Sequence, residues 1–289
     1  MLGEGAVNRG ISFDEAGGTP RIRELEVSIT RRCNLACAQC GFMVPDQPSP
    51  ALGDVAQEAA AGIAHLGRLG IRIGTLVVLG GEPTLDGGRL VRVLRALRGV
   101  GNFDRLEVVS NGLHPQGLTT EALQYIDRFV VSVYFDDSAL SELWSRWLAA
   151  VAPHVELQLR LHADGWDRWT GDERVDDARA QQLYDACWYR KHCVTVERGR
   201  LFACSRIPKL ARDAEGLPLT DDVTLASVTD YLNRNRFLPS CQTCVPMMEL
   251  GTVTPGVQPD GRLVRLTTRA IRVLAARVSA AESQSGADP

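Results

Sequence analysis

The first half of the chain alternates between apolar runs and amphipathic stretches. Five runs rich in Val, Ile and Leu predict β-strands at residues 24–30, 75–80, 106–112, 128–135 and 154–161. Between them, apolar residues at helical spacing predict helices at residues 55–70, 88–101, 119–126 and 138–151. This alternation predicts right-handed βα crossovers and an α/β fold with a parallel sheet or partial barrel. Chemistry in such folds lies in the loops after the carboxyl ends of the strands.

The pattern changes after residue 161. Residues 162–177 are polar and acidic and predict a loop that carries Trp166 and Trp169. Further along, the sequence predicts a helix at 177–187, a β-hairpin at 192–204 that turns at Arg198–Gly199, a basic amphipathic helix at 262–278 and a disordered tail at 282–289.

Composition narrows the class of protein. The 289 residues carry a net charge of −3 and are 45% hydrophobic, which suffices for a sizeable core and gives no electrostatic case for nucleic acid. No apolar run is long enough for a membrane span, and the amino-terminal residues do not resemble a secretory signal, so we expect a cytoplasmic protein. Eight cysteines in a reducing compartment indicate metal binding or catalysis before disulfides.

Three of these cysteines, Cys33, Cys37 and Cys40, follow the first predicted strand. Their thiolates suit an iron–sulfur cluster or zinc. Three ligands leave one iron of a four-iron cluster open, as a catalytic metal requires. The same spacing would also suit thiols packed on one helix face, but three prolines in the next ten residues argue against a continuing helix.

The segment RCNLACAQC at 32–40 resembles the signature of the radical S-adenosylmethionine (SAM) superfamily. The resemblance implies a [4Fe–4S] cluster held by Cys33, Cys37 and Cys40, with its unique iron chelating the amine and carboxylate of SAM. Gln39 stands where the family usually has an aromatic residue near the adenine, and Phe42 is the alternative ring.

Other segments resemble further motifs of the family. LVVLGGEPTL at 76–85 resembles the second signature, which implies that Gly80, Gly81 and Glu82 receive the SAM amino group and that Pro83 ends the strand. Residues 108–112 and 132–134 resemble segments near the SAM ribose or carboxylate. The residues that this resemblance assigns to SAM are Ser110, Asn111, Ser132 and Tyr134.

Arg160 lies on the last predicted strand and points toward the same end. It is a candidate for holding a SAM carboxylate or a substrate anion, or for pairing with an acidic helix residue. Polar residues at strand ends also commonly hydrogen-bond turns, so that use stays open for each of these positions, and His162 is equally ambiguous.

The remaining cysteines resemble the twitch form of the SPASM extension, in which a hairpin and a following helix hold one auxiliary [4Fe–4S] cluster. The implied ligands are Cys187, Cys204, Cys241 and Cys244, with Gly199 at the hairpin turn. A closed zinc site is the alternative for four thiolates. Cys193 remains a replacement for Cys187, a buried free thiol, or a hydrogen donor to a substrate radical.

The resemblance divides the chain into a lead-in at 1–22, a radical SAM partial barrel at 23–180, a twitch/SPASM-like domain at 181–250, and a helix with its tail at 251–289. It implies an enzyme that cleaves SAM to a 5′-deoxyadenosyl radical, similar to 2-deoxy-scyllo-inosamine dehydrogenase-like enzymes. The expected substrate is a small polar metabolite (an aminocyclitol, sugar or nucleoside), and the expected electron donor is a flavodoxin or ferredoxin.

Three alternatives stay open. One is a redox-neutral epimerase that uses Cys193, and another is an enzyme that modifies a ribosomal peptide. The third is a zinc or iron–sulfur protein without catalysis that acts through the basic helix at 262–278, because such helices can bind membranes or acidic partners.

Overall fold

The structure is built around one mostly parallel sheet. The computed structural model describes residues 10–13, 18–44, 54–134, 138–162, 165–258 and 261–285. The nine strands run in the order β10-β9-β8-β2-β3-β4-β5-β6, with β1 beside β2, and a second sheet pairs β11 with β7. The strands are β1 (Ser12–Phe13), β2 (Pro20–Ser28), β3 (Arg72–Leu79), β4 (Phe103–Ser110), β5 (Arg128–Val133), β6 (Glu156–Leu161), β7 (Trp166–Asp167), β8 (Val194–Glu197), β9 (Arg200–Phe202), β10 (Leu217–Pro218) and β11 (Thr252–Val253).

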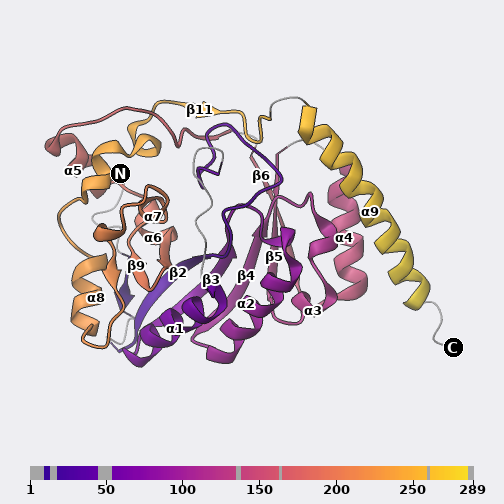
Figure 1. Cartoon of the computed structure of the whole chain (residues 1–289), viewed down its shortest axis with the longest axis horizontal. Helices are drawn as coiled ribbons and strands as arrows, with labels where there is room; N and C mark the ends of the chain where they lie inside the picture. Colours follow the sequence, from indigo (N-terminus) through magenta and orange to yellow (C-terminus); the bar gives the residue numbers. More distant parts are fainter. Residues whose placement is uncertain are drawn as a thin grey trace, which may run out of the picture.

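The helices connect these strands in the predicted order. They are α1 (Val55–Arg68), α2 (Gly87–Val100), α3 (Thr120–Leu123), α4 (Ser138–Val151), α5 (Asp177–Asp185), α6 (Tyr189–His192), α7 (Arg206–Lys209), α8 (Leu225–Leu232) and α9 (Arg262–Ser285). Helices α1 to α4 each link two neighbouring parallel strands between β2 and β6 and lie along one side of the sheet (Figure 1). The predicted α/β fold with a parallel sheet is confirmed.

Side chains alternate between the two faces of the central strands. Leu25, Leu76 and Leu106 are fully buried in the apolar core. The next residue on each strand points to the opposite face, because side chains alternate along a strand. These next residues are Glu26, Val77 and Glu107, which the register places side by side and which line a cavity.

The hairpin at 192–204 joins the same sheet. It turns at Arg198 and Gly199, whose φ angles are 51° and 66°, as the sequence predicts. Strand β8 pairs parallel with β2, so the hairpin of the segment 181–250 extends the sheet of the first half. The sequence did not indicate this pairing, because no local pattern of residues in one strand identifies a partner strand so far along the chain.

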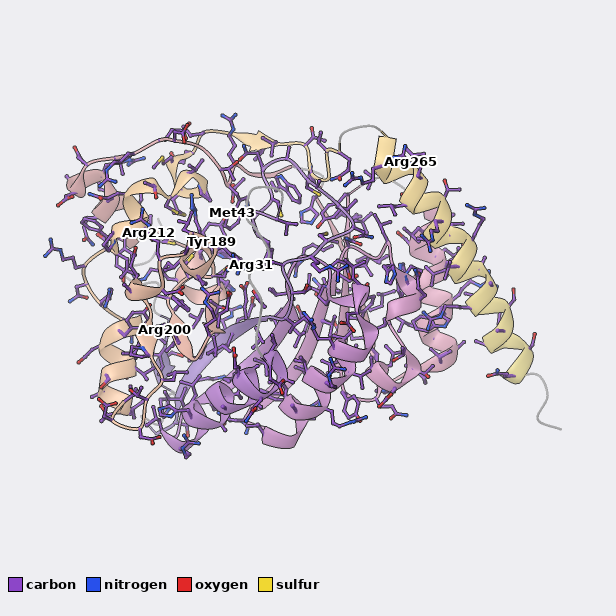
Figure 2. All side chains as sticks on the ribbon, in the orientation of Figure 1. Arg31, Met43, Tyr189, Arg200, Arg212 and Arg265 are labelled. Carbon is purple, nitrogen blue, oxygen red and sulfur yellow. The ribbon has the colours of Figure 1, made fainter. Side chains whose placement is uncertain are left out.

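A buried group of charges joins the end of β2 to the hairpin. Arg31 Nη2 lies 2.9 Å from Glu197 Oε1 and donates also to the carbonyl of Pro208. Lys209 is 1% exposed, lies 4.0 Å from Glu197 Oε2 and donates to Ser28 Oγ at 3.2 Å. Arg31 is labelled in Figure 2. Glu197 therefore faces two buried cations, and Lys209 also faces Glu26.

The carboxy-terminal helix packs on α4 (Figure 1). Ala270, Leu274 and Val278 are buried, and the Arg277 guanidinium lies 3.8 Å from the centre of the Trp147 ring. The arginines on the other side of α9, Arg265, Arg269 and Arg272, are exposed. No helix within the described ranges is long and apolar enough to cross a membrane.

The prediction of a disordered tail at 282–289 is wrong for its first four residues. Helix α9 continues to Ser285, because Glu282 pairs with Arg146 of α4 at 2.8 Å and Ser283 Oγ donates to the carbonyl of Ser279. The rest of that predicted tail lies outside the described residues, as does most of the predicted lead-in before residue 18.

The substitution Glu197→Ala should lower the free energy of unfolding by about 3–5 kcal/mol, because it leaves Arg31 buried without its counter-charge and removes one of the two carboxylates that face Lys209. Urea denaturation followed by circular dichroism measures the change. The control is Glu121→Ala, which breaks the exposed pair with Arg95 and should lower the free energy of unfolding far less, because water already solvates both charges. Equal losses in the two variants would contradict a structural role for the buried group.

Candidate active site

A cavity of about 540 Å³ lies at the carboxyl ends of the parallel strands and extends along one face of the sheet. Its wall includes the strand residues Glu24, Glu26, Val77, Leu79, Glu107, Val109, Ser132 and Arg160. The loops contribute Cys33, Cys37, Cys40, Phe42, Gly80, Gly81, Asn111, Tyr134, His162 and Trp169, among others, and Trp166 and Asp167 of β7 and Tyr189 of α6 complete the wall. Most of the SAM-site residues predicted from the sequence therefore share one cavity, while Gln39, Glu82, Pro83 and Cys193 lie outside its lining.

The three cysteines after β2 converge at this cavity. Burial raises the pKa of Cys33 and brings that of Cys37 to about 12, the charges of Cys37 and Cys40 raise the pKa of Cys33 further, and the charge of Cys40 raises that of Cys37. Two of the sulfurs accept hydrogen bonds from N–H groups: Gln258 Nε2 lies 2.9 Å from Cys37 Sγ, and the Leu35 amide nitrogen lies 3.4 Å from Cys33 Sγ. Such donors stabilise a thiolate, which is the form that binds iron.

No group of three or more His, Cys, Asp or Glu side chains in the described part of the chain is arranged to hold a single metal ion. A four-iron cluster makes a different demand, because each thiolate binds a different iron. The cysteines would therefore stand around a cluster, without meeting at one point.

The two glycines after β3 let the backbone lie against the cysteine loop. A Cβ atom at Gly80 would lie 2.3 Å from the carbonyl oxygen of Thr30, and one at Gly81 equally close to that of Arg32. The Gly81 amide donates to the Thr30 carbonyl at 2.8 Å, and the Glu82 amide donates to the Arg32 carbonyl at 2.8 Å. The second motif thus positions the backbone that leads into Cys33.

Glu82 is fully buried and accepts hydrogen bonds from three neighbouring residues. Its Oε1 accepts from Thr84 Oγ1 at 2.6 Å and from Ser110 Oγ at 2.8 Å, and its Oε2 accepts from the Asn111 amide at 2.7 Å. These bonds fix the ends of β3 and β4 together. Asn111 then donates to Asn34 Oδ1 at 2.8 Å beside Cys33. Glu82 therefore positions residues that line the cavity without lining it itself.

Gln39 holds the loop that carries the tryptophans. Its Oε1 accepts from the amides of Trp169 and Thr170, each at 2.8 Å, and its φ angle is 57°. The Trp169 ring packs on Gly41, where a Cβ would lie 3.1 Å from the ring. Gln39 thus anchors Trp169 against the cysteine loop, and contact of Gln39 with adenine stays a prediction.

Aromatic side chains form another part of the wall. Tyr134 stacks on His162 at 5.6 Å between ring centres and meets Trp166 edge-on at 5.4 Å. The Phe42 ring lies 4.4 Å from Lys209 Nζ. Tyr189, labelled in Figure 2, donates its hydroxyl to Asp167 and so links α6 to the tryptophan loop. These rings supply flat apolar surface beside the polar strand residues.

Cys187, Cys204, Cys241 and Cys244 form a second group away from the cavity. Burial raises the pKa of Cys241 to about 12 and that of Cys244 to about 11. Burial also raises the pKa of Cys204, and the next causes include the charges of the other three thiols. The structure thus brings together the four cysteines that the resemblance implies.

Cys193 has a different neighbour. Burial raises its pKa well above the ordinary value, and the adjacent Glu26 carboxylate, to which it is hydrogen-bonded, raises it further. Among the other cysteines only Cys204 contributes noticeably to that shift. This placement favours Cys187 over Cys193 as the fourth member of the second group.

A buried arginine accompanies the second group. Arg206 follows Cys204 by two residues and is 4% exposed. Its Nη2 donates to the carbonyl of Thr243, next to Cys244, at 2.9 Å. Its Nε and Nη1 have no hydrogen-bond partner in the described structure. An unpaired buried guanidinium requires an anion, and a cluster held by four thiolates supplies one.

Three further cavity residues, Glu24, Glu26 and Glu107, are not among the site residues predicted from the sequence. Burial and the neighbouring carboxylates raise the pKa of Glu24 to about 7, and burial raises the pKa of Glu26 and Glu107. The sequence did contain a sign of Glu24 and Glu26: the two acids alternate within the predicted strand at 24–30, so both face the same side.

No family model matches the chain, and no curated protein matches it.

If the second cysteine group holds a [4Fe–4S] cluster, replacing Cys187 by Ala should lower the iron bound after anaerobic reconstitution by about 4 per chain, since it removes one of the four ligands. The matched variant Cys193→Ala should keep the iron content of the wild type, because Cys193 is bonded to Glu26. Iron and sulfide analysis measures both. The reverse pattern would assign the fourth ligand to Cys193.

Proposed function

We propose that the chain is a radical SAM enzyme that oxidises a small polar metabolite. The observation that carries the proposal is the convergence of Cys33, Cys37 and Cys40 at a polar cavity at the carboxyl ends of parallel strands. A [4Fe–4S] cluster on these thiolates, when bound, supplies the low-potential electron that cleaves SAM to a 5′-deoxyadenosyl radical.

The residues around the three cysteines suit SAM. Ser110, Asn111 and Ser132 line the cavity beside the cysteines and offer donors and acceptors for a carboxylate and a ribose. The SAM amino group donates hydrogen bonds and would rely on acceptors such as backbone carbonyls, because the amides of Gly81 and Glu82 are themselves donors and already donate to the cysteine loop. Tyr134 and Phe42 provide aromatic surface for the adenine.

The second cysteine group supports oxidation as the outcome. An auxiliary [4Fe–4S] cluster, when bound to Cys187, Cys204, Cys241 and Cys244, offers an acceptor for the electron that oxidation releases. Epimerisation would need a thiol at the substrate. Cys193 is bonded to Glu26 and does not line the cavity, which favours oxidation.

Several further features fit a small substrate inside the cell. Arg160 and the rings of Trp166 and Trp169 line the cavity and suit a polar ring compound such as an aminocyclitol, sugar or nucleoside. A flavodoxin or ferredoxin would supply the electron. The alternative of a partner-binding basic helix loses support, because α9 packs its apolar side on α4.

Anaerobic reconstitution of the wild type should give about 8 Fe per chain and 5′-deoxyadenosine from SAM under reduction by dithionite. The variant with Cys33, Cys37 and Cys40 replaced by Ala should keep about 4 Fe and make no 5′-deoxyadenosine. About 4 Fe with one zinc in the wild type would assign zinc to the second group. Full SAM cleavage by the triple variant would contradict the proposal.

Replacing Arg206 by Met should lower the reduction potential of the auxiliary cluster by roughly tens of millivolts, because the loss of a nearby buried cation disfavours adding an electron. Redox titration followed by electron paramagnetic resonance measures it. Arg206→Lys keeps the charge and should shift the potential less. Equal potentials in Arg206→Met and wild type would show that the cation does not act on the cluster.

A further inference from the structure

A side chain from the carboxy-terminal part of the chain lies against the sulfur of one of the three cysteines. Gln258 Nε2 lies 2.9 Å from Cys37 Sγ, and Gln258 Oε1 accepts from the Ala36 amide at 2.6 Å. Cys37 is only 7% exposed, so this side chain stands where water has little access. Gln258 belongs to the segment 251–289, to which the family resemblance assigns no residue of the site.

Two neighbours fix which way the Gln258 amide points. The backbone amide of Ala36 can only donate, so the atom of Gln258 that faces it is the oxygen. The nitrogen then faces Cys37, and it also lies 3.3 Å and 3.2 Å from the carbonyl oxygens of Gly256 and Val257. The reversed amide would set one N–H group against another at Ala36 and an oxygen against the thiolate at Cys37. Both sides therefore demand the same orientation.

The backbone that leads to Gln258 is held at three places. Strand β11 pairs with β7. Gly256, with a φ angle of 66°, packs so closely on Tyr134 that a Cβ atom would lie 2.5 Å from the Tyr134 Cβ. The Val257 carbonyl accepts from the Ala38 amide at 3.2 Å. The N–H group of Gln258 is therefore positioned at the Cys37 sulfur by the fold itself.

We infer that Gln258 is a positioning residue that raises the reduction potential of the cofactor at the three cysteines. The inference rests on the proposed function, which assigns a [4Fe–4S] cluster to Cys33, Cys37 and Cys40. Reduction by one electron makes the cluster and its thiolate sulfurs more negative, and a donor at a sulfur stabilises the more negative form more strongly. Gln258 therefore lets a weaker electron donor reduce the cluster.

Two other N–H groups lie near Cys33, and both differ from Gln258. The Leu35 amide lies 3.4 Å from Cys33 Sγ and belongs to the backbone. Asn111 Nδ2 lies 3.7 Å from Cys33 Sγ but only 2.8 Å from Asn34 Oδ1, so its stronger hydrogen bond goes to Asn34. Gln258 makes the shortest of these three contacts with sulfur, and a single substitution removes it without altering the backbone.

Two substitutions at this position test the inference. Gln258→Met keeps a side chain of similar length without a donor, so the equilibrium constant for reducing the cluster should fall about 3- to 10-fold, which is about 30–60 mV for one electron. Gln258→Lys keeps an N–H donor at Cys37 and adds a positive charge, so the potential should equal or exceed that of the wild type. Both variants lose the acceptor for Ala36, so a role limited to holding the loop would shift both potentials in the same direction.

The measurement is a redox titration of the reconstituted full chain, followed by electron paramagnetic resonance. The variant with Cys33, Cys37 and Cys40 replaced by Ala identifies the signal of the auxiliary cluster, whose potential should be unchanged in both Gln258 variants. Iron analysis checks that each variant keeps the iron content of the wild type. Equal potentials in wild type and Gln258→Met, parallel shifts in the two variants, or loss of iron from Gln258→Met would overturn the inference.

The same samples are assayed for 5′-deoxyadenosine after addition of SAM and dithionite. If the wild type cleaves SAM but its potential does not depend on Gln258, the inference fails and the proposed function stands. If the potential depends on Gln258 as expected but no sample cleaves SAM, the proposed function fails and the role of Gln258 stands. If the three cysteines bind no cluster, both fail.

Discussion

The ion pair between Arg31 and Glu197 is the contact on which the relation between the two halves of the chain depends. Arg31 lies two residues before Cys33, and Glu197 ends the strand that leads to the hairpin carrying Cys204. With Lys209 it forms a buried group of charges that bridges the two halves, and removing one member leaves the others buried without their partner. Two cysteine groups from distant parts of the chain are thereby held in a fixed relation, which electron transfer between two centres requires.

The two faces of the sheet have different roles, because side chains alternate between them along each strand. Leu25, Leu76 and Leu106 hold the helices on one face, and Glu26 and Glu107 face the cavity from the same strands. Neither role constrains the other, because neighbouring residues on a strand point to opposite sides. The polar cavity therefore costs the apolar core nothing, and the burial of its carboxylates is partly offset by Arg128 beside Glu107 and Lys209 beside Glu26.

Much of this arrangement could be predicted from local patterns. The apolar runs located β2 to β6, and Gly199 located the hairpin turn, because both depend on nearby residues. The position of the three cysteines after the first predicted strand could likewise be read directly from the sequence. The pairing of β8 with β2, the hydrogen bonds that Glu82 accepts and the anchoring of Trp169 by Gln39 depend on partners far along the chain, and no periodicity reports them. The helical ending of α9 was missed because its last turn is held by Arg146 of another helix.

The loop that carries the three cysteines is completed by residues near the other end of the chain. The Ala36 amide donates to Gln258 Oε1, 222 positions away, and the Ala38 amide donates to the carbonyl of Val257. The same Gln258 side chain donates to Cys37. During synthesis, the ribosome releases the cysteines long before it releases Gln258. The loop therefore reaches its final form only after nearly the whole chain has emerged, so a cofactor bound at these cysteines would meet its complete site only in a nearly finished protein.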